Sequence, residues 1–212
     1  MLKKAALDPE VISIKMTLYR MARESQIVQA LIEAAENGKE VVALVELRAR
    51  FDEQNNIDWS KQLEEAGCTI LYGFDDYKVH SKLTLITKKG PQGYSYITQI
   101  GTGNYNEKTS ELYTDYSFIT ADLGIGEEAS NVFQNLAVQK LTETSEKMLV
   151  APLRFKSVLL DEMDRVINAA RLGRPASMIL KNNSISDRDI ILKLEEASCA
   201  GVRIDMLSLI HI

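Results

Sequence analysis

The chain has 212 residues, of which 45% are hydrophobic and 26% are charged, and its formal net charge at pH 7 is −5. This composition is typical of a folded protein with an apolar core, and it excludes collagen-like, low-complexity and coiled-coil chains. The negative charge argues against a general nucleic-acid binder, because such proteins displace counterions from the phosphate backbone with a basic surface.

Cysteine content and hydropathy predict a cytoplasmic protein. Cys68 and Cys199 are the only cysteines, too few for a disulfide framework or a Cys-x-x-Cys metal site. The chain contains no stretch of about 18 apolar residues, the length that a membrane helix needs. Met1–Lys4 leads into polar sequence rather than into the apolar core of a signal peptide.

Helix and strand patterns alternate in the first third of the chain. Ser25 is expected to cap a helix that ends at Gly38, and the apolar run Val41–Val45 is typical of a strand buried in a parallel sheet. A second helix is predicted from residue 57 to residue 66, and Thr69–Tyr72 is predicted as the next strand. This order predicts an α/β fold in which helices cover a sheet.

The middle of the chain predicts a β-hairpin. Residues 79–86 alternate between the two faces of a predicted strand, which places His80 and Lys82 on the same face. The turn at residues 89–93 reverses the chain into a strand at residues 94–100, and the Gly-rich loop Gly101–Asn106 follows.

Two further elements follow the Gly-rich loop. A strand is predicted near Tyr116–Thr120, and a helix is predicted from residue 127 to residue 141. The inward residues of this helix are expected to be Val132, Phe133, Leu136 and Ala137.

The second half repeats the order of the first. A helix with Met163 and Ile167 in its apolar stripe is predicted to end at Gly173, and a strand at residues 176–180 follows. The pattern from Ser186 to Asp189 is expected to cap another helix. Similar helical segments in the two halves favour a duplicated plan, although Leu-Glu-Glu-Ala is also ordinary helix sequence and that alternative stays open.

The H-x-K pair of His80 and Lys82 is the first candidate for chemistry. An imidazole can attack phosphorus, and an ammonium on the same strand face can stabilise the phosphoryl oxygens. The alternative is a solvated strand face. The Gly-rich loop with Asn104, and Arg20 and Arg50 near strand ends, favour a local phosphate site in an otherwise acidic protein.

Four segments resemble the C-terminal catalytic region of bacterial polyphosphate kinase: Ile14–Arg20, Val45–Glu53, Lys78–Lys82, and Gly101–Asn106 followed by Leu112–Asp115. The resemblance extends from about Asp8 to Asp205. It implies the α/β fold of the phospholipase D-like superfamily, a mixed sheet with helices on both faces. In this family two similar domains face a shared active site.

The resemblance also implies site residues. His80 matches the histidine that ATP phosphorylates, Lys82 is the lysine of the H-x-K pair, Tyr113 matches a tyrosine at the nucleotide, and Asp115 is expected to orient the imidazole. Arg20 and Arg50 match two arginines assigned to phosphate and to Mg²⁺, the expected cofactor. Because a guanidinium cannot ligate a cation, both are interpreted as clamps on phosphate oxygens near the metal.

The chain departs from the family at two places. Thr87 stands where phospholipase D enzymes carry an aspartate five residues after the lysine. After Asp205 the family continues with an Arg-Gly segment and a second active-site histidine, for which His211 lies too early. The chain is therefore expected to be a fragment, with a first catalytic domain at residues 1–145 and a truncated second domain at residues 146–212 that ends in a non-native segment, Leu207–Ile212.

The leading hypothesis is reversible transfer of the terminal phosphate of ATP to inorganic polyphosphate through a phosphohistidine at His80. The expected partners are ATP, ADP and polyphosphate but no nucleic acid, and the fragment alone is expected to be inactive. Two alternatives stay open: a phospholipase D-like phosphodiesterase and a noncatalytic polyphosphate-binding module. The family also implies a homo-oligomer of the full-length protein and peripheral association with the inner membrane.

Overall fold

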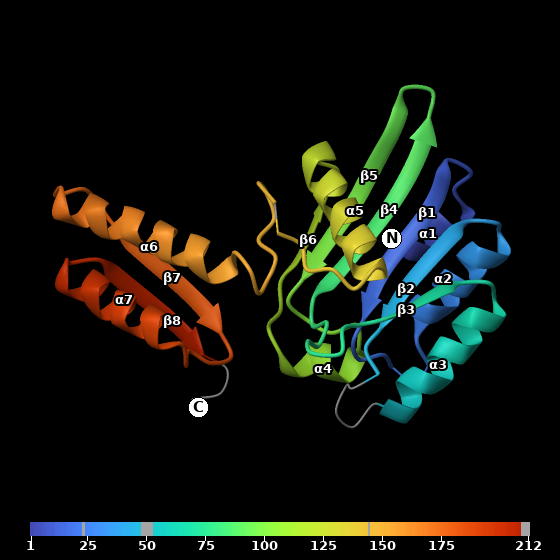
Figure 1. Ribbon diagram of the computed structural model, residues 1–212, viewed down its shortest axis with the longest axis horizontal. Coiled ribbons are helices and arrows are strands. Elements are labelled where there is room, and N and C mark those ends of the chain that lie inside the picture. The colour runs from blue at the N-terminus through green and yellow to red at the C-terminus, as the bar shows by residue number, and fades with distance from the viewer. Residues whose placement is uncertain (23, 48–52, 144, 209–212) are drawn as a thin grey trace. The chain divides into compact units, whose positions relative to one another are not determined.

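The chain divides into two compact units, residues 1–142 and residues 143–212. The computed structural model describes residues 1–22, 24–47, 53–143 and 145–208, so Arg50 lies outside the described residues. The first unit is built on a six-stranded mixed sheet, and the second unit contains a two-stranded parallel sheet with two helices (Figure 1).

The sheet of the first unit is half parallel and half antiparallel. Its strands lie in the order β3, β2, β1, β4, β5, β6. The first three are parallel to one another, and β4, β5 and β6 continue the sheet in antiparallel pairs. Their bounds are β1 Val11–Leu18, β2 Glu40–Val45, β3 Thr69–Tyr72, β4 Lys82–Gly90, β5 Gly93–Gly101 and β6 Ser117–Thr120. The predicted mixed α/β architecture is confirmed.

Helices cover the sheet and close its core. Helices α1 (Leu2–Leu7), α2 (Gln26–Glu36) and α3 (Glu53–Glu65) contribute apolar side chains to one cluster with β1, β2 and Ile86 of β4. Helix α5 (Leu123–Ala137) packs on β4 and β5 and crosses in front of them in Figure 1. The short helix α4 (Glu107–Leu112) follows the Gly-rich loop.

Several sequence predictions of this unit are confirmed. Ser25 caps α2 by accepting a hydrogen bond from the backbone N–H of Val28, the buried strand lies where the sequence placed it, and the turn of the predicted hairpin is present between β4 and β5. The long helix was misplaced by four residues. The side chain of Asp122 accepts a hydrogen bond from the N–H of Ile125 and caps α5, so the helix starts at Leu123. The helix ends at Ala137, which is exposed rather than facing inward as predicted.

The predicted strand at residues 79–86 begins too early. The backbone ladder between β1 and β4 ends at the pair Met16 and Thr84, and β4 itself starts at Lys82. Beyond that pair, the hydroxyl of Thr17 accepts from the N–H of Leu83 and donates to the carbonyl of Ser81. A side chain therefore replaces the next backbone bonds, and His80 lies in the segment before the strand.

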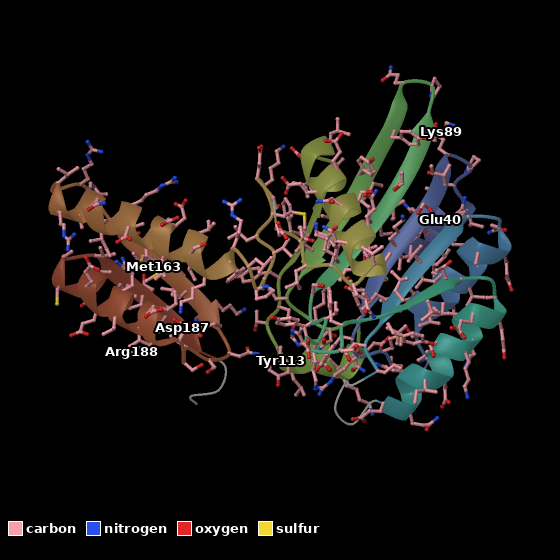
Figure 2. The ribbon with its side chains drawn as sticks, in the orientation of Figure 1. Glu40, Lys89, Tyr113, Met163, Asp187 and Arg188 are labelled. Carbon is pink, nitrogen blue, oxygen red and sulfur yellow. The ribbon has the colours of Figure 1, made fainter. Side chains whose placement is uncertain are left out.

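The second unit follows the predicted order of helix, strand, helix and strand. Its elements are α6 (Phe155–Arg171), β7 (Ser177–Asn182), α7 (Arg188–Cys199) and β8 (Arg203–Ser208). The predicted cap of α7 was wrong by one residue. Asp187 accepts hydrogen bonds from the N–H groups of Asp189 and Ile190 at the start of the helix (Figure 2).

The helix ends give both units the same local plan. In α2, α3, α6 and α7 a glycine with positive φ follows the helix, and the next residue donates its N–H to a carbonyl five residues earlier. These bonds join Lys39 to Ala34, Cys68 to Leu63, Arg174 to Ala169 and Val202 to Ala197. The strands then pair in the same register, Val42 with Thr69 and Ser177 with Arg203, each pair at the same offset from its glycines.

The hydroxyl of Thr98 provides a test of the core. Thr98 lies in β5 opposite Leu85, is fully buried, and its Oγ1 atom has no hydrogen-bond partner among the described residues. Valine has a similar shape without the polar atom. We expect Thr98→Val to raise the free energy of unfolding by about 1 kcal/mol, measured by urea denaturation. A lower free energy of unfolding would contradict this expectation.

Candidate active site

Polar residues gather at one end of the first unit's sheet. Tyr19 and Arg20 follow β1, Glu46 follows β2, and His80 precedes β4. Because β4 is antiparallel to β1 and to β5, its start lies at the same end as the carboxyl ends of β1 and β5. The Gly-rich loop leaves β5 at this end too, since Lys82 pairs with Gly101.

His80 and Lys82 meet at the start of β4. The ammonium Nζ of Lys82 lies 3.1 Å from Nδ1 and 3.2 Å from Nε2 of His80, and it donates to the carbonyl oxygen of His80 at 2.6 Å. The ring of Tyr19 packs edge-on against the imidazole, with 4.6 Å between ring centroids. The predicted convergence of the H-x-K pair is therefore present, although the two residues do not share a strand.

The surroundings of His80 disfavour the protonated form of its imidazole. Desolvation lowers the pKa of His80 below its ordinary value, and the charges of Lys82 and Arg20 lower it further. The ring still reaches solvent. A neutral imidazole has a ring nitrogen with a free lone pair, which is the form that can attack phosphorus.

Lys82 is a buried lysine with a perturbed pKa. Its side chain is 3% exposed and lies over the Tyr19 ring, with Nζ 5.1 Å from the centroid. Desolvation lowers the pKa of Lys82 to about 8, Arg20 lowers it as well, and the charge of Asp115 raises it. At neutral pH the group is thus mostly an ammonium, but it loses its charge only slightly above neutrality.

The Gly-rich loop is anchored from inside the sheet. Tyr105 donates from its hydroxyl to Oε1 of Gln99 at 2.6 Å and lies 3.2 Å from the hydroxyl of Thr84. Burial raises the pKa of Tyr105 to about 12, so the phenol stays protonated. Next to it, the Oδ1 atom of Asn104 is buried, and none of the described residues bonds to it. An amide oxygen only accepts hydrogen bonds, so the NH2 group is the part of Asn104 that suits a phosphate oxygen.

Asp115 is held against the Gly-rich loop. Its Oδ1 atom accepts from the hydroxyl of Thr102 at 2.8 Å, and a Cβ on Gly103 would come within 2.5 Å of its Oδ2 atom, so this close approach requires glycine. Among the described residues no hydrogen bond joins Asp115 to His80. Its charge acts on Lys82 instead. The role of orienting the imidazole stays a prediction.

The remaining predicted site residues are Tyr113, Arg20 and Arg50. Tyr113 follows α4, is 43% exposed, and lies at the surface (Figure 2). Arg20 lies beside Tyr19, with Cζ 5.8 Å from the ring centroid, and its charge acts on both His80 and Lys82. Arg50 lies outside the described residues.

Sequence reasoning missed the polar residues beneath His80. Glu46 is buried and accepts from the N–H of Val79, and the fully buried Asn56 of α3 donates from Nδ2 to the carbonyls of Tyr19 and Glu46, each at 2.8 Å. The available signal was a glutamate directly after the apolar run of β2. Asn56 offered no comparable signal, because it stands in an ordinary helical sequence.

The described side chains contain no cluster of three or more possible ligands (histidine, cysteine, aspartate or glutamate) that could hold a metal ion by itself. Mg²⁺ takes oxygen ligands in an octahedron. Arg20 and Lys82 are cations that bind phosphate oxygens rather than metals. The geometry therefore fits a polyanion.

Two family models match most of the chain. The model described as polyphosphate kinase C-terminal domain 1 matches residues 1–142, and polyphosphate kinase C-terminal domain 2 matches residues 148–209.

No helix in the described part of the chain is both long and apolar enough to span a membrane.

The chain is similar to curated and solved polyphosphate kinases. It is 45% identical over 206 residues to the polyphosphate kinase of Staphylococcus saprophyticus, covering 97% of this chain and 29% of the relative. It is 44% identical over 207 residues to that of Pseudomonas aeruginosa, covering 98% and 30%. The crystal structure of polyphosphate kinase from Porphyromonas gingivalis matches with a TM-score of 0.85 and 36% identity, covering 97% of this chain and 34% of that chain.

These matches give the extent, the fold and the family of the chain. It spans less than a third of the length of the curated relatives that it matches. The similarity to a solved polyphosphate kinase extends over both units, and the predicted phospholipase D-like α/β fold is confirmed. The chain belongs to the polyphosphate kinase family.

Proposed function

We propose that this chain carries the phosphohistidine step of a polyphosphate kinase, which transfers the terminal phosphate of ATP reversibly to inorganic polyphosphate. The observation that carries the proposal is the imidazole of His80 within 3.1 Å of the buried ammonium of Lys82. Family membership supplies the two substrates, and the geometry supplies a nucleophile and a cation for them.

The proposed reaction has two transfers. A ring nitrogen of His80 attacks the γ-phosphorus, the N–P bond forms, and the bond from phosphorus to the β-phosphate oxygen breaks to release ADP. A terminal oxygen of polyphosphate then attacks the phosphohistidine and restores the imidazole. Lys82 and Arg20 stabilise the negative charge on the phosphoryl oxygens in both transfers. The amide of Asn104 donates to another phosphate oxygen.

The nucleotide contacts are also part of the proposal. Tyr113, exposed at the end of α4, packs against the nucleotide, and Arg50 acts with Arg20 as a clamp on phosphate oxygens. Mg²⁺ enters with the ATP substrate, bound to its phosphate oxygens. Asp115 keeps Lys82 charged by raising its pKa.

A chimaera tests the activity. This chain replaces the segment that it matches in the Staphylococcus saprophyticus protein, and the chimaera is incubated with γ-labelled ATP, Mg²⁺ and polyphosphate. Label is expected in polyphosphate, and reversal with ADP is expected to form ATP. A folded chimaera that transfers no label would contradict the proposal. Residues 1–212 alone are expected to give little or no synthesis, since they span less than a third of the relatives.

The same assays separate the alternatives. A phosphodiesterase would release a product from a diester without ATP, but Thr87 lies within β4, paired with Tyr96, where phospholipase D enzymes have an aspartate. A noncatalytic module would bind polyphosphate as tightly without His80 and form no phosphoenzyme. Oligomer formation and association with the inner membrane stay predictions from the resemblance, as does the division into domains at residues 145 and 146.

A further inference from the structure

We propose that Thr17 and Glu46 are positioning residues that hold His80 and Lys82 in their convergent geometry. The inference rests on the proposed function, because it concerns the same imidazole. It assigns a role in the reaction to two residues whose side chains hydrogen-bond to the backbone on either side of His80.

Thr17 fixes the chain after His80. Its hydroxyl is buried, donates to the carbonyl of Ser81 at 2.7 Å and accepts from the N–H of Leu83 at 3.0 Å. The donor and the acceptor flank Lys82. One hydroxyl thus satisfies two backbone groups at the point where the β1–β4 ladder stops, and it directs the chain out of the strand.

Glu46 fixes the chain before His80. Its Oε2 atom accepts from the N–H of Val79 at 3.0 Å, and its own backbone carbonyl is held by Asn56 at 2.8 Å. The same Asn56 amide holds the carbonyl of Tyr19, whose ring packs against His80. The backbone on both sides of His80 and the ring beside it are therefore tied to the carboxyl ends of β1 and β2.

The two anchors determine which groups meet. The ammonium of Lys82 reaches back to the carbonyl oxygen of His80 at 2.6 Å and to its ring nitrogens at 3.1 and 3.2 Å. In a regular strand the side chains of residues i and i+2 both project away from the backbone, so the ammonium would not fold back onto the carbonyl in this way. Displacing either anchor separates the ammonium from the imidazole. A nucleophile and its cation lose much of their effect when they are displaced by about 1 Å.

The first test measures geometry without any substrate. In residues 1–212 the pKa of His80 is determined by NMR from the carbon-bound ring protons, and His80→Gln assigns the signals of the two histidines. Thr17→Val is expected to raise the pKa of His80 toward its ordinary value of 6.5, because the cation Lys82 moves away from it while Arg20 stays. Thr17→Ser keeps the hydroxyl and is expected to leave this pKa unchanged.

The second test measures the rate of phosphoenzyme formation in the chimaera. Thr17→Val is expected to lower this rate by about tenfold or more while the KM for ATP stays within about twofold, and Thr17→Ser is expected to restore it. Thr98→Val is the matched control, since it removes a buried hydroxyl of the same sheet that has no partner among the described residues.

The second anchor gives an independent pair of variants. The amide oxygen of Glu46→Gln can still accept from Val79, whereas Glu46→Leu cannot, so only the leucine variant is expected to shift the pKa of His80 and to slow phosphorylation. This pair decides the question where Thr17→Val does not fold. The proposal is overturned if a folded Thr17→Val or Glu46→Leu variant keeps both the pKa and the rate, or if Thr17→Ser fails equally. An inactive unsubstituted chimaera would contradict the proposed function instead. The pKa of His80 measured by NMR would still show whether Thr17 and Glu46 hold Lys82 beside it.

Discussion

Replacing His80 by glutamine is expected to abolish the phosphoenzyme. With the chimaera and γ-labelled ATP, the label bound to protein and the synthesis of polyphosphate should each fall by about a thousandfold or more, since the proposed nucleophile is gone. The label should be stable in base and labile in acid, as a phosphorus–nitrogen bond is. Mass spectrometry should locate it in the wild-type peptide that contains Val79, His80 and Ser81.

Stability measurements serve as the control for this substitution. The His80 ring reaches solvent, so His80→Gln is expected to change the free energy of unfolding by no more than about 0.5 kcal/mol. Loss of labelling would then report lost chemistry rather than lost fold. A folded His80→Gln chimaera that still carries label on this peptide would remove His80 from the mechanism.

Lys82 is expected to set the alkaline limit of the reaction. Because the pKa of Lys82 is lowered to about 8, its ammonium is present below that pH and is lost as the pH rises through it. The rate of phosphoenzyme formation should therefore fall above about pH 8. Desolvation and the charges of Lys82 and Arg20 shift the pKa of His80 downward, away from this range, so the imidazole is not expected to cause the fall. Lys82→Met should lower the rate by about a hundredfold at pH 7.

Arginine is the informative control at this position. A guanidinium stays charged across the whole range, so Lys82→Arg should lose the alkaline limb even where its geometry lowers the rate. The ratio of the two rates at each pH cancels the titration of ATP and isolates that of residue 82. An alkaline limb that is identical in Lys82→Arg would show that another group causes it.

The sequence predicted much of the fold because its signals were local. Ser25 as a cap, the glycines after the helices and the apolar run of β2 depend on residues close in the chain, and each was found where expected. The central strand β1 was overlooked. Its sequence is apolar enough for a strand, with buried Ile14, Met16 and Leu18, but it lay inside a segment read as a motif rather than as an element.

The site was predictable in its residue types but not in its geometry. The H-x-K spacing pointed to His80 and Lys82, yet their backbone is held by a hydroxyl whose two partners lie 64 and 66 residues away in the chain, which no local pattern encodes. Asn56 was missed for the same reason, because its Nδ2 donates to backbone carbonyls and any residue can supply a carbonyl. Glu46 follows an apolar run, but the sequence did not show that its carboxylate accepts from the N–H of Val79.

The hairpin of β4 and β5 links the site to the opposite end of the sheet. Lys82 pairs with Gly101 at the site and Gly90 pairs with Gly93 at the turn, about 27 Å away at the usual rise of a strand. A two-residue turn fixes the register of the whole ladder, and a slip of one residue would turn every side chain to the other face. The exposed turn at residues 91–92 therefore sets which residue of β5 lies beside Lys82, and a change in its length would move the start of the Gly-rich loop away from that lysine although the turn lies at the far end of the sheet.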